Sequence, residues 1–288
     1  MEAEADHTLK LRRALDHLQW LSDYEREWFR GDSHHSVRVT QTELDLGGLR
    51  GPYGFPLYQF EAWVRAEPPP TYPFALVIGE CLHNMRSALD LLAYELAVAN
   101  VYPQPVSEDV KEASEFPIIG DESAKGIPGM GAGIFRDNAL PRKIRGVNPS
   151  AHAPIEAVQP YIDGTAFREH PLWRLHQLDR ISKHRLLHTV VAFVEDAGFS
   201  LTRSKNFSGA AYPTPYPGIV HNERETKVAS IGGGPMWDEE MVVVIKPTLS
   251  VCFAPDTPDA DTAPVVPLLA DVYRYITDNV LPWLEALL

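Results

Sequence analysis

The sequence predicts an α+β fold in which helices pack around one central apolar helix, with antiparallel strands on one side. Two observations support this prediction. Several long stretches repeat apolar residues at spacings of three and four, which is typical of helices. The shorter β-branched stretches cluster together and do not alternate singly with helices, as a doubly wound parallel sheet would require.

Local patterns place each element along the chain. Leu11, Leu15, Leu18 and Leu21 share one face of the first helix. The segment Phe74–Ala99 is apolar nearly all round, which predicts a helix covered on most sides. The expected order is helix 9–29, strands 36–46 and 57–65, helices 74–99 and 171–188, strands 189–194, 198–203, 219–231, 241–245 and 248–253, and a last helix, 264–287, kinked at Pro282.

Residues 102–160 are rich in proline and glycine, which predicts a long irregular loop. Gly126–Gly133 is expected to be its most flexible part. The apolar run Phe116–Ile119 is expected to dock on the core. Because the later helices are too apolar to stand alone, we expect a single domain over residues 1–288.

Composition narrows the classes of function. Lys and Arg total 26 against 39 Asp and Glu, a net charge of −13, which makes nucleic acid an unlikely partner because its binding needs a positive field. No apolar run approaches the roughly 20 residues that span a bilayer, so no membrane partner is expected. Cys81 and Cys252 are too few for a disulfide scaffold or a zinc site. We expect a cytoplasmic protein without a metal or cofactor.

The central helix carries an unusual set of polar side chains. His83, Arg86 and Asp90 follow one another at spacings of three and four, which places them on one helix face. Breaking a buried ion pair leaves an uncompensated charge and costs about 3–5 kcal/mol. These three side chains therefore require partners from another element.

The next predicted helix offers such partners, because Asp179 and Lys183 lie four residues apart on it. Antiparallel packing of the two helices would bring Arg86 to Asp179. It would also bring Asp90 to Lys183 or Arg185. The result would be a polar cluster between two apolar helices, with the candidate members His83, Arg86, Asp90, Asp179, Lys183, His184 and Arg185.

Two interpretations of this cluster stay open. It is either a buried network of ion pairs that fixes how the helices register, or a site for chemistry or binding. In a site, His83 or His184 would act as an acid, a base or a ligand, because histidine titrates near neutral pH. The arginines and Lys183 would hold an anion.

The stretches LHNMRSALDLLAYEL, FPI and HPLWRLHQLDRISKHRLL together resemble a family of uncharacterised bacterial proteins. The resemblance covers about residues 76 to 190 and implies no particular activity. The positions that match its recurring pattern are His83, Asn84, Arg86, Asp90, Asp179, Lys183, His184 and Arg185.

A weaker resemblance is to the HEPN superfamily of helical bundles, many of which are RNases that use an Arg and a His on one helix. Here Arg180 and His184 are separated by three residues, a shorter spacing than that pattern. The resemblance implies a metal-independent RNase, or another hydrolase, that uses His83 or His184 with Arg86, Lys183 or Arg185.

Our first expectation for function is a non-enzymatic protein that binds a small anionic ligand or a protein partner, such as a second copy of itself in a homodimer. The hydrolase is the alternative. No serine in a nucleophile elbow and no set of metal ligands is evident, which favours the first expectation.

Overall fold

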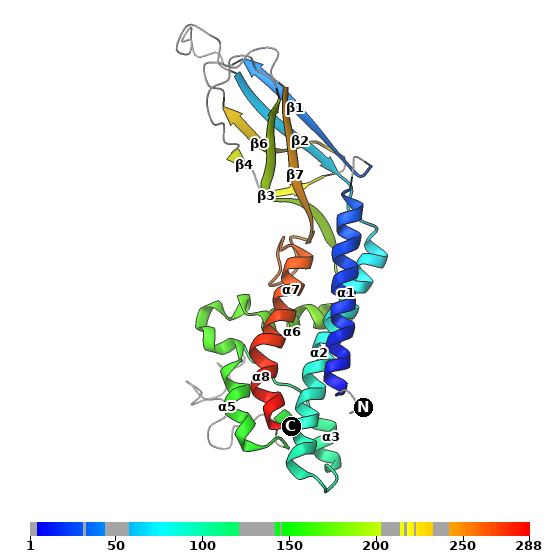
Figure 1. The fold of residues 1–288 in the computed structure, drawn as a ribbon, viewed down its shortest axis with the longest axis vertical. Helices are drawn as coiled ribbons and strands as arrows, with labels where there is room; N and C mark the ends of the chain where they lie inside the picture. Colours follow the sequence, from blue (N-terminus) through cyan, green and yellow to red (C-terminus); the bar gives the residue numbers. More distant parts are fainter. Residues whose placement is uncertain are drawn as a thin grey trace. The chain divides into compact units, whose positions relative to one another are not determined.

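A computed structural model describes most of the chain (Figure 1). The described residues are 5–30, 33–43, 58–120, 142–144, 146–202, 214–215, 218–221, 223–232 and 242–288. Helices and antiparallel strands together confirm the predicted α+β class. The chain divides into a helical unit, formed by Met1–Ser22, Tyr72–His188 and Pro255–Leu288, and a strand unit, formed by Asp23–Thr71 and Thr189–Ala254. The expectation of one domain stays a prediction.

Helix α2 (Thr71–Val101) is the centre of the helical unit, as its apolar surface predicts. Its fully buried side chains include Ile78, Leu82, Met85 and Leu89. Helix α1 (Asp6–Trp28) runs beside it, and the Cys81 thiol on α2 donates a hydrogen bond to a carbonyl of α1 (Figure 1). Burial raises the pKa of this thiol to about 12, which keeps it protonated.

The remaining helices of the unit are shorter. They are α3 (Glu108–Ala113), α5 (Pro149–Ala157), α6 (Pro171–Ser182), α7 (Val265–Tyr275) and α8 (Leu281–Leu284). Helical turns of other types are η2 (Arg142–Ile144), η3 (Pro160–Glu169) and η5 (Glu285–Leu287), which are 3-10, and η4 (Ile276–Val280), which is a π-helix.

The segment 102–160, predicted to be an irregular loop, contains α3 and α5 among its described residues. The prolines misled the prediction, because Pro149 stands in the first turn of α5, where proline favours a helix. The Asn148 side chain caps the same helix by accepting from the Ser150 N–H. Phe116 is fully buried, which confirms the predicted docking, whereas Gly126–Gly133 lies outside the described residues.

The expected break at Pro282 takes the form of the π-helical turn η4, which directly precedes it. Proline has no N–H to donate to the carbonyl four residues before it, and a wider turn accommodates that loss.

The strand unit holds two antiparallel sheets. The first has the order β1-β2-β6-β4 and contains β1 (His35–Glu43), β2 (Tyr58–Ala66), β6 (Thr226–Gly232) and β4 (Thr214–Pro215). The second has the order β5-β3-β7 and contains β5 (Gly218–Val220), β3 (Thr189–Thr202) and β7 (Val242–Phe253). The predicted hairpin is present, with His35 opposite Ala66 and Glu43 opposite Tyr58.

Two predicted strand breaks are wrong, because β3 and β7 are each continuous where the sequence indicated two strands. The register between them shifts between Phe193 and Ala197, and Ala197 lies opposite Pro247. An irregularity of this kind accommodates a proline inside a ladder, since proline cannot donate a ladder hydrogen bond.

Candidate functional site

The predicted site residues lie in the helical unit, but they do not form one cluster, because those on α2 point to two separate places. Arg86 and Asp90 contact the segment at residues 115–116, whereas His83 faces Asp179 of α6. The expected pairs of Arg86 with Asp179 and of Asp90 with Lys183 or Arg185 are therefore wrong.

The first pair fails because Glu115 occupies the place beside Arg86. The second fails because α6 ends at Ser182 and not near His188 as predicted. Lys183 is the C-cap of α6 and forms an ion pair with Asp179 of the same helix, with 2.7 Å between Nζ and Oδ2. His184 and Arg185 follow the helix end and are exposed, so they do not continue its polar face.

The first place is the Arg86 cluster, which consists of Arg86, Asp90, Glu115, Phe116 and Lys143. Arg86 is 4% exposed, and its Nη2 donates to Asp90 Oδ1 at 2.8 Å, to Glu115 Oε1 at 2.7 Å and to the Phe116 carbonyl at 2.7 Å. The Phe116 N–H donates to Asp90 Oδ1 at 3.0 Å, and Lys143 Nζ lies 2.7 Å from Glu115 Oε2. Two cations thus meet two carboxylates, and the cluster fastens residues 115–116 to α2.

Burial and charge act on the two carboxylates of the cluster with different results. Burial raises the pKa of Asp90 above its ordinary value, although the charge of Arg86 opposes this. Burial also acts to raise the pKa of Glu115, but the hydrogen bond from Lys143 and the positive charge of Arg86 outweigh it, so this pKa is lowered. The two cations of the cluster match its two carboxylates in number, while Arg86 Nη1 is buried without a hydrogen bond among the described residues.

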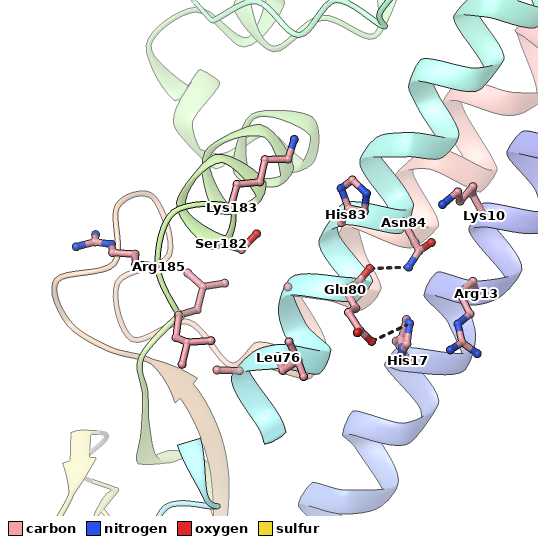
Figure 2. A pocket seen from close by; sticks show the side chains of 14 residues that line it. Lys10, Arg13, His17, Leu76, Glu80, His83, Asn84, Ser182, Lys183 and Arg185 are labelled. Carbon is pink, nitrogen blue, oxygen red and sulfur yellow. Dashed lines mark hydrogen bonds and ion pairs between the residues drawn. The ribbon is translucent and has the colours of Figure 1, made fainter. Parts of the chain in front are cut away.

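The second place is the basic pocket, a cavity of about 580 Å³ bounded by α1, α2 and the segment that follows α6 (Figure 2). Its size is in the range typical of small-molecule sites. It is lined by Lys10, Arg13, His17, Ala75, Leu76, Gly79, Glu80, His83, Asn84, Ser182, Lys183, Arg185, Leu186 and Leu187.

Regular helix geometry builds two walls of this pocket. On α1, Lys10, Arg13 and His17 recur at spacings of three and four, so they share one face. The pocket residues of α2 follow the same spacing from Leu76 through Gly79 and Glu80 to His83 and Asn84. His17 Nε2 lies 3.5 Å from Glu80 Oε2, which sets the level at which the two walls face each other.

His83 lines the pocket from α2, and Figure 2 shows it between Lys183 and Asn84. Its side chain is 56% exposed, and its Nδ1 lies 3.8 Å from Oδ1 of Asp179, which is only 5% exposed. That carboxylate oxygen is buried without a hydrogen bond among the described residues. On the other side of the ring, His83 Nε2 lies 3.4 Å from Ser87 Oγ.

Charge in the pocket is not balanced. Glu80 pairs with His17, and Asp179 pairs with Lys183. Within the part of the chain that the structure describes, Lys10, Arg13 and Arg185 have no carboxylate within ion-pair distance. Figure 2 shows that Arg185 is directed away from α2. The other two cations, Lys10 and Arg13, line the pocket from α1.

His17 belongs to this pocket and is nearly buried. Burial lowers its pKa, although the neighbouring Glu80 carboxylate opposes the change. The neutral form of His17 is therefore favoured near pH 7 in the free protein.

The sequence analysis grouped His83 and Lys183 with Asp179, whose carboxylate lies 3.8 Å from His83 and 2.7 Å from Lys183, but it missed the wall on α1. A signal for it exists, because Lys10, Arg13 and His17 form a basic stripe at helical spacing. Glu115 and Lys143 of the Arg86 cluster were also missed, and no local pattern marks them, since both come from segments distant in sequence.

The described residues contain no group of three or more His, Cys, Asp and Glu side chains arranged to hold a metal ion. None of the helices in this part of the chain has the length and apolarity needed to cross a membrane. Comparisons with protein-family models, curated proteins and solved structures found no match to the chain.

Proposed function

We propose that the protein binds a small anionic ligand in the basic pocket. The observation that carries this proposal is a pair of cations, Lys10 and Arg13, which line the pocket without a carboxylate partner among the described residues, in a chain of net charge −13. Like charges held together repel one another, and an anion relieves that repulsion. Arginine and lysine are the usual partners of carboxylate and phosphate groups.

Gly79 supports the proposal independently. Glycine inside a helix costs about 0.5–1 kcal/mol relative to alanine. A Cβ at this position would meet Ser182 Cβ at 3.5 Å, an ordinary van der Waals contact, so packing does not require glycine here. Since Gly79 lines the pocket, the missing side chain instead leaves the pocket floor open.

The hydrolase is the second candidate, and one observation favours it. Ser87, His83 and Asp179 lie in the order of a nucleophile, a base and an orienting carboxylate. We rank it second because Lys183 already holds Asp179 at 2.7 Å, closer than His83 at 3.8 Å. Binding to a protein partner or a second copy stays a prediction.

The test is a calorimetric titration of the full chain with inorganic phosphate and with a panel of small carboxylates. In the double variant Lys10→Gln/Arg13→Gln we expect the affinity for the tightest anion to fall at least tenfold, because two unpaired cations are removed. The matched control is Arg26→Gln/Arg30→Gln, which removes two exposed cations outside the pocket.

Equal losses in both double variants would mean that net charge, and not the pocket, governs binding. Absence of binding to every anion would overturn the proposal. Hydrolysis of an RNA or an activated ester that is lost in Ser87→Ala would instead favour the second candidate.

A further inference from the structure

The lining of the basic pocket changes in character along α2. At one end are Ala75 and Leu76, and two turns later are His83 and Asn84. Between them lie the open position at Gly79 and Glu80, whose carboxylate is directed to His17 on α1. With a rise of 1.5 Å per residue, the distance along the helix axis from Leu76 to His83 is about 10 Å. The α2 wall therefore has an apolar end and a polar end.

The segment after α6 shows the same gradient. Ser182 approaches Gly79, and Lys183 pairs with the carboxylate that faces His83. Further along the chain, Leu186 and Leu187 line the pocket. This wall therefore also carries both a cation and an apolar pair.

Helix α1 places its cations at the polar end. His17 pairs with Glu80, and the Cys81 thiol bonds to the Ala14 carbonyl, so α1 and α2 run antiparallel. One helical turn before His17, Arg13 comes level with Asn84. Lys10, a further turn away, borders both this pocket and a neighbouring cavity that contains Ser87.

Apolar surface is left exposed at the other end. Leu76 is 44% exposed and Leu186 is 40% exposed, although both border the cavity. Covering such side chains stabilises a complex in proportion to the apolar area removed from water. An inorganic anion would leave this end of the pocket empty.

We infer that the ligand of the basic pocket is an amphipathic organic anion. Its charged group lies at the His83 end beside Lys10 and Arg13, and its apolar body extends toward Leu76 and Leu186. This inference rests on the proposed function and names the chemical class of its ligand. A carboxylate with an aliphatic chain about 10 Å long has the required charge and length.

The test is a calorimetric titration of the full chain with octanoate, acetate, octan-1-ol and inorganic phosphate. Octanoate should bind at least tenfold more tightly than acetate, since each buried methylene contributes about fourfold in affinity. It should also bind at least tenfold more tightly than octan-1-ol, which has the chain without the charge.

Two double variants test the apolar end and the charged end of the pocket separately. Leu76→Ser/Leu186→Ser should reduce the affinity for octanoate at least tenfold and leave that for acetate unchanged, because both side chains are exposed and the fold does not depend on them. The matched control is Leu9→Ser/Ile162→Ser, which alters two exposed apolar side chains outside the pocket. Lys10→Gln/Arg13→Gln should reduce the affinity of the protein for both octanoate and acetate.

Equal affinity for octanoate and acetate would overturn the inference, as would equal affinity for octanoate and octan-1-ol. Tight binding of phosphate or acetate without octanoate would also overturn it but leave the proposed function standing. Failure of all anions to bind would overturn both.

Discussion

Helix α2 borders two groups of ionic side chains, which differ in whether their charges have partners. In the Arg86 cluster, a nearly buried guanidinium meets two carboxylates and a backbone carbonyl at 2.7–2.8 Å. In the basic pocket, His83 is 56% exposed, and Lys10 and Arg13 have no carboxylate partner in the described part of the chain. In the cluster each cation has a carboxylate partner, whereas the pocket leaves Lys10 and Arg13 without one among the described residues.

This difference means that the residues important for stability and those important for binding lie at different positions along the same helix. A buried charge with its partners holds neighbouring segments together, and loss of one partner leaves the others uncompensated. An exposed, unpaired charge contributes little to folding, so its substitution has little effect on stability. Variants at the two places should therefore differ in which measurement they change.

The largest expected effect is on stability, at Arg86. Arg86→Met should lower the free energy of unfolding by about 1.5–3 kcal/mol, because Asp90, Glu115 and the Phe116 carbonyl lose a buried charged donor, while the two carboxylates stay partly exposed to solvent. Urea unfolding followed by circular dichroism measures this. As the control, Arg13→Gln in the pocket should stay within about 0.5 kcal/mol of the wild type. Similar losses in the two variants would remove the distinction between the two places.

A smaller effect of opposite sign is expected at Gly79. Gly79→Ala should raise the free energy of unfolding by about 0.5–1 kcal/mol, because alanine favours the helix and its methyl group has room. The same variant should weaken anion binding, since the methyl group enters the pocket floor. Urea unfolding and calorimetry on the same samples test both statements.

Gly146→Ala is the matched control for this variant. A Cβ at Gly146 would come within 2.3 Å of Val110 Cγ1, so alanine should destabilise there. If Gly79→Ala were destabilising as well, glycine at this position would be a packing requirement and would no longer support a ligand site.

The sequence predicted those parts of the fold that depend on local pattern. The apolar surface of α2, the hairpin of β1 and β2 and the docking of Phe116 all follow from periodicity or from a short apolar run. The end of α6 was not predictable in this way, because its helical pattern continues past Ser182 without a glycine or proline to end it.

The sequence predicted which polar residues of α2 lie near one another in the candidate site, but not which partners they contact. Residues three or four apart share a helix face only approximately, so His83 and Arg86 point to different neighbours although the spacing groups them. Tertiary packing decides which segment lies beside each of these side chains. Glu115, from beyond α3, takes the place beside Arg86 that the sequence assigned to Asp179.

The smallest expected effect is a pH dependence that acts differently at the two places. His176 of α6 feels the charges of the Arg86 cluster: burial lowers its pKa, and the positive charges of Arg86 and Lys143 add to this. Burial also lowers the pKa of His17 in the pocket. A histidine with a lowered folded pKa binds its proton less tightly in the folded than in the unfolded state. Its contribution to stability is therefore complete above pH 6.5 and is lost as the pH falls through the lowered value.

As the pH falls from 7.5 to 5.5, the free energy of unfolding should decrease while the affinity for an anion should increase, because protonated His17 adds positive charge to the pocket. His176→Gln should reduce the decrease in stability and leave the gain in affinity. His17→Gln should remove part of the gain in affinity. Unfolding and calorimetry at several pH values measure the two responses. If His17→Gln kept the full gain in affinity, His17 would not contribute to binding, and the pocket would lose one of its basic groups as a determinant of anion recognition.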